Sequence, residues 1–320
     1  MGERLKGIYM TEFHHVSVLL EECIDGLNIK PDGIYVDGTL GGAGHSSRIA
    51  AKLTTGRLIG IDRDEIALAA AARRLEPYKD RVTLVHSNFC EIASVLKQLN
   101  IDGVDGVLLD LGVSSPQLDD GSRGFSYMAD APLDMRMDNT DALTAATVVN
   151  TWPYEELKRI LYDYGEERYA PQIASAICRK REQKPIATTL ELVDVIRSAM
   201  PPAALREKQH PAKRSFQAIR IAVNDELGAV EKVMRDAVPC LNPGGRLAVI
   251  TFHSLEDRIV KNAMAEAAKG CTCPPNFPVC VCGKKPKVKL ITRKPIVSGD
   301  EELEVNPRAR SAKLRICEKL

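Results

Sequence analysis

The stretch VDGTLGGAGH, residues 36–45, decides the fold, because its four glycines join a short β-rich run, residues 34–37, to a helix-like run, residues 45–53. Glycine permits positive φ and leaves room for a ligand to touch the backbone, and the helix start that follows offers unpaired N–H groups. The stretch therefore predicts a ligand-binding turn in an α/β sheet. A turn that is merely tight is the alternative that the stretch alone leaves open.

Strand and helix signals continue to alternate on the carboxyl side of this turn. Further β-rich runs fall at 57–62, 82–85 and 104–111, and helix-like runs lie between them at 65–75 and 91–99. Strands that alternate with helices of this length predict parallel βαβ units. The run at 104–111 (VDGVLLDL) is nearly continuously apolar, which predicts a central strand in a sheet covered on both faces.

The alternation stops after Pro116. The residues that follow predict loops and helices, with helices expected at 154–164, 171–180 and 190–200. Strand and helix signals then return as a helix at 222–238, a turn at 242–245 and a strand at 246–252. Two halves of one sheet thus flank an insertion. We predict a discontinuous α/β domain, residues 1–118 and 221–320, and an inserted helical domain for substrate recognition, residues 119–220.

Composition places the chain among globular proteins. It has 320 residues, of which 44% are hydrophobic and 27% charged, and no apolar run approaches the roughly 20 residues of a membrane span. No secretory signal is visible at the N-terminus, and five of the nine cysteines are scattered as reduced core thiols are, namely Cys23, Cys90, Cys178, Cys240 and Cys317. We expect a cytoplasmic protein without a membrane partner.

Acidic and aromatic residues follow the later strands as the glycines follow the first. Asp62 ends the second strand, 25 residues beyond Asp37, where a carboxylate can accept both hydroxyls of a ribose. Capping of the next helix is the alternative for Asp62. Phe89 and Asp110 end the third and fourth strands, where ligands of open α/β sheets bind. Phe89 could flank an adenine, although ordinary packing explains a single phenylalanine equally well.

The glycine spacing separates two cofactors. A dinucleotide fingerprint requires G-x-G-x-x-G, and Ser47 stands at its third glycine position. S-adenosylmethionine is therefore the preferred cofactor. We predict the doubly wound, Rossmann-like sheet of a class I S-adenosylmethionine-dependent methyltransferase.

The turn LGVSSPQ, residues 111–117, directly follows Asp110. A turn stiffened by proline can aim an oxygen acceptor at an exocyclic amine and favour the pyramidal nitrogen that attacks a sulfonium methyl. Ser115 and Pro116 match the start of the (Asp/Asn/Ser)-Pro-Pro-(Tyr/Phe) motif of amino-group methyltransferases, whereas Gln117 is not aromatic. A ring that stacks on the target base must then come from elsewhere, for instance from Phe125, Tyr127 or Phe252. We assign catalytic roles to Asp110, Ser114, Ser115, Pro116 and His253.

Five longer strings make the pattern specific. They are FHHVSVLLEE at 13–22, LLDLGVSSPQLD at 108–119, RSFQAIRIAVNDEL at 214–227, NPGGRLAVITFHSLEDRIVK at 242–261 and NPRARSAKLR at 306–315. With the glycine loop they resemble the bacterial 16S ribosomal RNA cytosine-N4 methyltransferase family from about residue 13 to the C-terminus. The resemblance implies that S-adenosylmethionine is bound by Ala43, Gly44, His45, Asp62, Phe89, Asp110 and Gln117. It implies N4-methylation of a cytidine in the decoding region, with 16S rRNA in the assembled small subunit as partner, and it leaves a homodimer open.

Basic residues gather in three segments, although the formal net charge is only +1. Residues 203–220 carry five Lys or Arg against one Glu, residues 284–294 carry six against none, and Arg308, Arg310, Lys313 and Arg315 form a third cluster. Such patches attract RNA backbones, while solvated charge is the ordinary explanation of any single run. His253 and Arg258 follow the fifth strand, and we expect them to contact the target nucleotide; helix capping by Ser254 is the alternative there.

Cys271, Cys273, Cys280 and Cys282 place four thiols close together in the sequence. Four thiolates can bind zinc, but C-x-C is shorter than the usual ligand spacing, so a loop of reduced cysteines stays the alternative. No catalytic metal is expected, because transfer from a sulfonium needs none. Two other functions stay open: a methyltransferase of the same fold acting on protein or a small molecule, and an RNA-binding assembly factor that binds the cofactor without transferring a methyl group.

Overall fold

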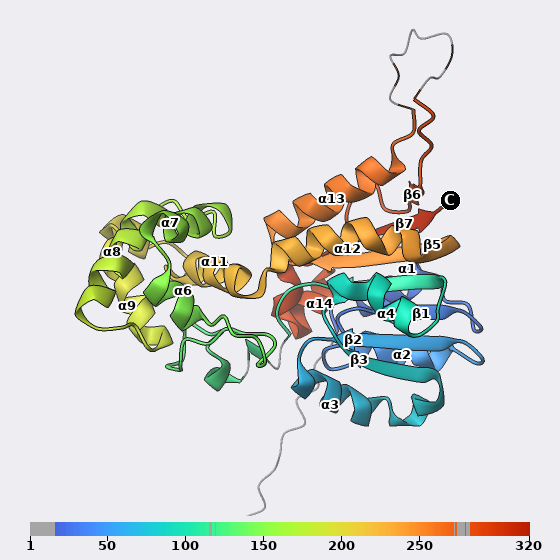
Figure 1. Ribbon diagram of the computed structural model, residues 1–320, viewed down its shortest axis with the longest axis horizontal. Helices are drawn as coiled ribbons and strands as arrows, with labels where there is room; N and C mark the ends of the chain where they lie inside the picture. The colour runs from blue at the N-terminus through green and yellow to red at the C-terminus, as the bar shows by residue number, and fades with distance from the viewer. Residues whose placement is uncertain (1–16, 115–116, 119, 272, 274–278, 280–281) are drawn as a thin grey trace, which may run out of the picture.

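A mixed sheet of seven strands forms the centre of one half of the molecule (Figure 1). The computed structural model describes residues 17–114, 117–118, 120–271, 273, 279 and 282–320. The strands are β1 Ile34–Asp37, β2 Arg57–Asp62, β3 Val82–His86, β4 Val104–Asp110, β5 Leu241–Thr251, β6 Val288–Leu290 and β7 Lys313–Lys319. Their order is β3-β2-β1-β4-β5-β7-β6, in which β1 to β5 are parallel and β7 is antiparallel to both of its neighbours. The predicted pairing of the two halves across the insertion is confirmed, because β4 pairs with β5.

Helices cover both faces of the sheet, as a parallel sheet of apolar strands requires. One face packs on α1 Leu20–Leu27, α2 Gly44–Lys52 and α3 Glu65–Arg74, and the other on α4 Ile92–Gln98, α12 Glu226–Cys240 and α13 Ser254–Ala268. Each face has its own buried apolar core, one around Tyr35, Leu58 and Leu108 and one around Val36, Ile59 and Leu109. Adjacent residues of each strand therefore serve opposite faces. The predicted doubly wound α/β fold is confirmed.

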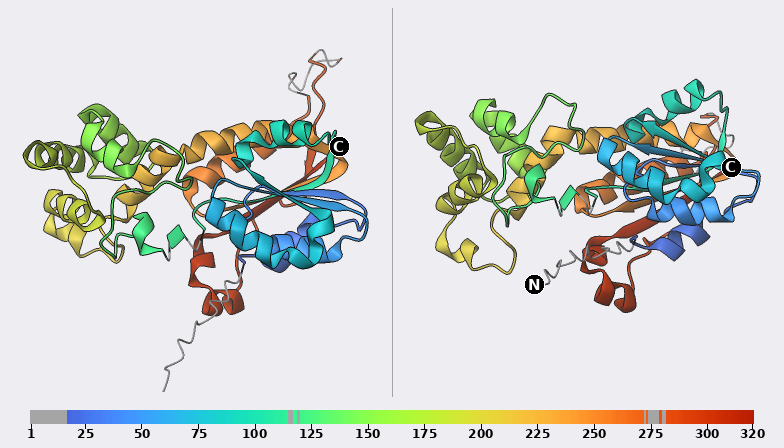
Figure 2. Two further views of the ribbon diagram at one scale, coloured as in Figure 1. Left: turned by 60° about the horizontal axis from the view of Figure 1, so that its bottom comes forward. Right: turned by 90° about the horizontal axis from the view of Figure 1, so that it is seen from below.

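A second unit is built from helices and lies to one side of the sheet (Figure 2). Its helices are α6 Ala145–Thr151, α7 Tyr154–Asp163, α8 Ala170–Gln183, α9 Thr189–Ala199, α10 Pro202–Leu205 and α11 Lys213–Asn224. They surround a third apolar core that includes Leu157, Ile173 and Ile196. We call this assembly the helical unit; its role as a substrate-recognition domain stays a prediction.

The helix predicted at 222–238 is two helices. Asp225 adopts a left-handed backbone conformation, with φ of 47°, and separates α11 from α12. Phe216, Ile219 and Val223 of α11 pack into the core of the helical unit, so residues 222–224 continue that unit's last helix. The periodic apolar pattern runs through the break, which is why the sequence suggested one element.

The C-terminal part of the chain completes the sheet in a way that the sequence did not indicate. After α13, the chain forms β6, the short helix α14 Asp300–Val305, a 3₁₀ helix at 307–311 and β7. Other 3₁₀ helices lie at 76–81, 89–91 and 121–123. Arg315 in β7 is only 8% exposed and donates to Asp257 Oδ1 of α13 at 2.7 Å. Among the described residues, none of the helices combines the length and the apolar character needed to cross a bilayer.

Candidate functional site

Hydrogen bonds to the Asp37 side chain hold the loop after β1 in place. Asp37, at the end of β1, accepts hydrogen bonds from the Thr39 amide at 3.2 Å and from the Ser46 hydroxyl at 2.6 Å. Burial raises the pKa of Asp37 to about 6, while these two donors act to lower it. A buried carboxylate thus ties the end of β1 to the first turn of α2.

The backbone of the loop takes conformations that favour glycine. Gly41 has φ of 48° and Ala43 has φ of 58°. At Gly44, a Cβ atom would lie 1.8 Å from Ser17 Oγ and 3.1 Å from Ser17 Cβ, so a larger residue would require Ser17, before α1, to move. His45 Nε2 lies 3.0 Å from the carbonyl oxygen of Val18, and its Nδ1 lies 3.9 Å from Asp110 Oδ2. Of the three loop residues implied by the resemblance, His45 therefore lies close to Asp110, and Ala43 and Gly44 directly precede it in the loop.

Asp62 reaches the same loop from the end of β2. Its Oδ2 accepts from the Gly41 amide at 2.7 Å, and its Oδ1 accepts from the Asp64 amide at 2.9 Å. Burial raises the pKa of Asp62 to about 6. The helix α3 is capped by Asp64, whose Oδ1 accepts from the Ile66 amide at 3.0 Å. The capping alternative for Asp62 is therefore wrong.

Asp110 ends β4 on the other side of the loop. Its amide donates to Thr39 Oγ at 2.6 Å, while its carboxylate oxygen Oδ1 is inaccessible and has no hydrogen-bond partner among the residues that the structure describes. Burial, together with the nearby charges of Asp37 and Glu256, raises the pKa of Asp110 to about 8. A buried carboxylate without a donor is costly unless a cation or a hydrogen-bond donor meets it.

Three carboxylates thus converge on one glycine loop at the carboxyl edge of β1, β2 and β4. Each has a raised pKa, and each of Asp62 and Asp110 senses the charge of Asp37. Such a group favours a cationic ligand, because a positive charge stabilises the ionised carboxylates. The unpartnered oxygen of Asp110 fits the ammonium and sulfonium charges of S-adenosylmethionine.

Both the oxygen and the nitrogen of the Gln117 side-chain amide are hydrogen-bonded. Its Oε1 accepts from the Ser114 amide at 3.1 Å, and its Nε2 donates to Asp64 Oδ2 at 2.9 Å. The same Asp64 oxygen accepts from Arg123 Nη1 at 3.0 Å. Gln117 therefore fixes the turn after β4 to the start of α3. Ser115 and Pro116, which were assigned catalytic roles, lie outside the described residues.

The aromatic candidates occupy different surroundings. Phe89 begins the 3₁₀ turn after β3, and a Cβ on Gly38 would lie 3.1 Å from its Cβ, so Phe89 lies beside the glycine loop. Phe125 is buried in the core of the helical unit, and Tyr127 stacks on His210 at 4.6 Å between ring centroids. Phe252 lies 3.5 Å from the place of a Cβ on Gly112, which puts it against the turn after β4.

His253 caps α13. Its Nδ1 accepts from the Glu256 amide at 3.4 Å, and Glu256 Oε2 accepts in return from the amides of Phe252 and His253. The cap predicted as an alternative at Ser254 is one residue off, because Ser254 instead donates to Glu166 Oε2 of the helical unit at 2.9 Å. His253 therefore has a structural role that its sequence position did not reveal.

A buried ion pair lies next to the cap at His253. Arg220, in the last turn of α11, binds both oxygens of Glu226, at 2.8 and 2.9 Å. Burial acts to raise the pKa of Glu256, but His253, the Phe252 amide and Arg220 hold it below its ordinary value. The carboxylates of Glu226 and Glu256 lie with a nitrogen of His253 within 4.8 Å of one another, and Arg220 already supplies a cation there.

The basic segments are only partly available to RNA. Arg220 is paired with Glu226, and Lys313 and Arg315 both pair with Asp257, at 3.3 and 2.7 Å. Asp257 therefore offsets part of the positive charge of Lys313 and Arg315, and RNA binding by this cluster stays a prediction. The run at 284–294 follows the far end of α13, which begins at the site and runs away from it (Figure 1). Arg206 and Lys208 in the helical unit are exposed.

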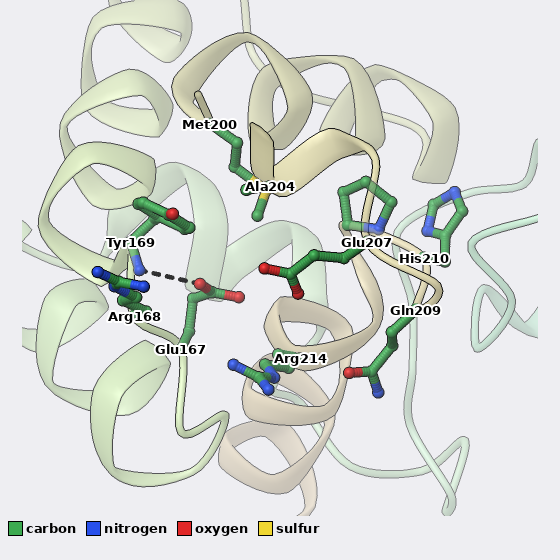
Figure 3. A pocket seen from close by; sticks show the side chains of 10 residues that line it. Glu167, Arg168, Tyr169, Met200, Ala204, Glu207, Gln209, His210 and Arg214 are labelled. Carbon is green, nitrogen blue, oxygen red and sulfur yellow. Dashed lines mark hydrogen bonds between the residues drawn. The ribbon is translucent and has the colours of Figure 1, made fainter. Parts of the chain in front are cut away.

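Two hollows lie near the helical unit and not in the glycine loop. One, of about 40 Å³, lies between Glu167, Glu207 and Arg214 and is too small for a cofactor (Figure 3). The other, of about 380 Å³, lies between Tyr162 to Arg168 of the helical unit and Leu255 and Arg258 of α13. Arg258 Nη2 lies 3.4 Å from Glu166 Oε1 at its wall. This second hollow is at the rim where α13 begins.

The sheet order with its antiparallel seventh strand, the glycine loop after β1, and the acidic residues after β2 and β4 define a class I S-adenosylmethionine-dependent methyltransferase. The model of the MraW methylase family matches residues 12–320. The chain therefore belongs to the MraW methylase family.

Curated relatives match the chain over nearly its full length. A protein of Brevibacillus brevis named ribosomal RNA small subunit methyltransferase H is 61% identical over 96% of this chain and 98% of its own length. Proteins of the same name from Heliobacterium mobile and Clostridioides difficile are 58% and 57% identical, each over 97% of this chain and 100% of their own length. Among solved structures, a Clostridium thermocellum protein described as a putative rRNA-methylase aligns with a TM-score of 0.45 at 12% identity, over 96% of this chain and 100% of its own.

Several residues of the site were not expected from the sequence. Asp37, Thr39 and Ser46 close the glycine loop, and Asp64 and Arg123 fix the turn after β4. The Asp-Gly-Thr triplet after β1 is an ordinary signal for a side chain that hydrogen-bonds the backbone two residues on, and it indicates the Asp37 bond. No local signal indicates the pairing of Arg123 with Asp64, because its partners are far apart in sequence.

Proposed function

We propose that the protein transfers a methyl group from S-adenosylmethionine to the N4 amine of a cytidine in the decoding region of 16S ribosomal RNA. The observation that carries the proposal is Asp110: its amide is bound to Thr39 of the glycine loop, it directly precedes the turn at 111–117, and its Oδ1 has no partner among the described residues. The names of relatives at 57–61% identity support ribosomal RNA of the small subunit as the substrate.

The residues of the strand ends divide the cofactor between them in this proposal. Asp62 accepts the ribose hydroxyls, Phe89 flanks the adenine, and Asp110 accepts from the ammonium group. Backbone groups at Ala43, Gly44 and His45 line the middle of the ligand. When bound, S-adenosylmethionine supplies an electrophilic methyl group on a sulfonium centre. Gln117 contributes by holding the turn that faces this methyl group.

The turn after β4 positions the target amine. Its start is anchored to β5 by the Leu111 amide, which donates to the Ile250 carbonyl at 3.0 Å, and Gly112 then takes φ of 97°. We assign the orientation of the amine to Ser114, Ser115 and Pro116, with Phe252 as the ring that stacks on the base. Positioning the amine in line with the methyl group supplies most of the acceleration.

The helical unit completes the substrate site in this proposal. The hollow between α13 and the helical unit lies at the rim of the methyl-transfer site, and His253 and Arg258 stand at the start of α13. We propose that RNA of the assembled small subunit docks across this rim, that the enzyme acts in the cytoplasm, and that the inserted unit, residues 119–220, recognises the substrate. A homodimer stays open in this proposal, and light scattering measures the oligomeric state.

The proposal is tested by incubating the protein with labelled S-adenosylmethionine and with small ribosomal subunits from cells that lack this protein. The modified nucleoside is then identified by mass spectrometry. We expect label in N4-methylcytidine, and the Asp110→Asn variant should give none. Label in protein or in a small molecule would instead indicate a methyltransferase of the same fold with another substrate. Cofactor binding without transfer to any substrate would indicate an RNA-binding assembly factor.

Naked 16S RNA and assembled subunits serve as alternative substrates in the same assay. Transfer to assembled subunits alone supports the proposed partner. Equal transfer to naked RNA contradicts that part of the proposal while leaving the reaction itself intact.

A further inference from the structure

Three thiols meet outside the methyl-transfer site, in the segment 269–287 that joins α13 to β6, here called the arm. The sulfur atoms of Cys271, Cys273 and Cys282 lie within 4.8 Å of one another, and those of Cys271 and Cys282 are 3.6 Å apart. A disulfide would require about 2.05 Å. Cys280, the fourth thiol named from the sequence, lies outside the described residues. We propose that Cys271, Cys273 and Cys282 bind a structural zinc ion that clasps the arm.

The spacing of the sulfur atoms fits zinc. With Zn–S bonds of about 2.3 Å in a tetrahedron, two sulfur ligands lie about 3.8 Å apart. The measured 3.6 Å between Cys271 and Cys282 is close to this value. The short C-x-C spacing is no obstacle here, because the Cys273 amide donates to Cys271 Sγ at 3.4 Å and the sulfur atoms of Cys271 and Cys273 lie within 4.8 Å of each other. Amide donation to sulfur also stabilises a thiolate ligand.

The two ends of the arm lie close together, and their described residues form no buried core. The Lys287 amide donates to the Ala267 carbonyl at 2.8 Å, Lys284 pairs with Glu266, and a Cβ on Gly270 would lie 3.4 Å from Pro286. In Figure 1 the described ends of the arm leave the sheet beyond the end of α13. None of the described residues of the arm is buried. A segment that buries no apolar surface needs another source of order, and a metal ion is an ordinary one.

The position of the cluster indicates a structural role. α13 has 15 residues, so its C-terminal end lies about 22 Å from its start beside the methyl-transfer site. A metal at the arm therefore cannot touch the reacting atoms. Three thiolates and Zn²⁺ together carry a net negative charge, and the lysines that follow Cys282, at 284 and 285, offset it.

The site is tested by measuring metal content with the full-length protein, purified under a reducing agent and equilibrated with Zn²⁺ before removal of excess metal. We expect about one zinc per chain by mass spectrometry of the metal. The Cys273→Ser variant should lose at least about tenfold in zinc affinity. Cys178→Ser, which removes a similarly half-buried thiol from α8, is the matched control and should keep its zinc.

A second readout reports the structure of the arm. Trypsin should cut the wild-type chain after Lys284 slowly with zinc and quickly after a chelator, whereas Cys273→Ser should be cut quickly in both conditions. Substoichiometric metal after equilibration overturns the proposal. Zinc retained unchanged by Cys273→Ser and Cys282→Ser, or iron bound in its place, overturns it too. Methyl transfer is not part of either readout, so failure of the proposed function leaves this test unaffected.

Discussion

Asp110 is a carboxylate whose surroundings oppose its charge until a cation arrives. Its pKa is raised to about 8 by burial and by Asp37 and Glu256, and within the described part of the chain no group donates to its Oδ1. Asp62 and Asp37 share this character, with pKa values of about 6. The site is thus prepared for a positively charged ligand at the expense of the stability of the ligand-free protein.

This cost gives a prediction for the ligand-free protein. A carboxyl with a pKa of about 8 when folded and about 3.8 when unfolded holds a proton only in the folded state across that pH range. Ionisation of Asp110 therefore lowers the free energy of unfolding progressively as pH rises, and this destabilisation is complete above pH 8. Asp110→Asn should raise the free energy of unfolding by about 1–2 kcal/mol at pH 8 and change it little near pH 4. Urea unfolding at both pH values measures this; equal effects at the two pH values contradict it.

Single elements are fixed by side chains from distant segments. Asp64 caps α3 and, through its second oxygen, binds both Gln117 and the buried Arg123. One carboxylate therefore joins the end of β2, the turn after β4 and the entrance to the helical unit. Such a hub links helix stability to the geometry of the site.

Replacing the hub should destabilise the protein strongly. Asp64→Ala removes a helix cap, worth about 0.5–2 kcal/mol, and leaves a buried guanidinium unpaired, which costs about 3–5 kcal/mol. Thermal unfolding should show a much larger loss than Asp120→Ala, which removes an exposed cap from the 3₁₀ turn at 121–123. Equal losses for the two variants would refute the role of Asp64.

Substitutions of His253 can distinguish its role as the cap of α13 from contact with the substrate. Asparagine can cap a helix but cannot replace an imidazole in contact with substrate. If the cap is the main role, His253→Asn should keep stability and most of the methyl transfer, whereas His253→Ala should lose about 1 kcal/mol of stability. Unfolding and transfer assays on both variants distinguish the roles: a stable His253→Asn variant without activity indicates contact with the target nucleotide.

The sequence predicted the elements whose signals are local. β1 to β4 are short apolar runs bounded by turns, and Asp62 and Asp110 stand at the ends of two of them, so both the strands and their acidic residues could be located. β7 could not, because its charged residues Lys313 and Arg315 are matched by Asp257, far away in the sequence. The hydrogen bond between Asp64 and Arg123 could not be predicted either, because these residues are also far apart in the sequence. The cap at His253 depends on reciprocal hydrogen bonds with Glu256, which only the structure shows.

At the scale of the whole molecule, ion pairs and hydrogen bonds hold the helical unit against the sheet. Arg63 binds Asp141 and the Asn224 carbonyl, Arg220 binds Glu226, and Glu166 accepts from Ser254. Among these contacts, the pair with Glu226 uses the charge of Arg220, which a count of basic residues assigns to RNA. The exposed Arg206 and Lys208 are left as the stronger candidates for phosphate contacts.

Replacing both Arg206 and Lys208 by alanine should weaken RNA binding without changing cofactor affinity. Each lost phosphate contact should reduce the slope of log affinity against log salt by about 0.7–0.9. Filter binding of small-subunit RNA across a salt series measures the slope. The control Lys79→Ala removes an exposed lysine that pairs with Glu76, outside the helical unit, and should leave the salt slope unchanged. If the double variant also leaves the slope unchanged, the assignment of Arg206 and Lys208 is contradicted.

The most direct test of the account is calorimetric titration of S-adenosylmethionine into the protein at about pH 6 and pH 8, spanning the raised pKa values of the three carboxylates. Because a cation binds the ionised carboxylates, affinity should rise with pH, by up to about tenfold per pH unit for one proton released. Asp110→Asn should bind weakly, with little of this pH dependence, while the exposed Asp32→Asn should match the wild type. Undiminished affinity in Asp110→Asn at both pH values would contradict the claim that this edge of the sheet holds the methyl donor.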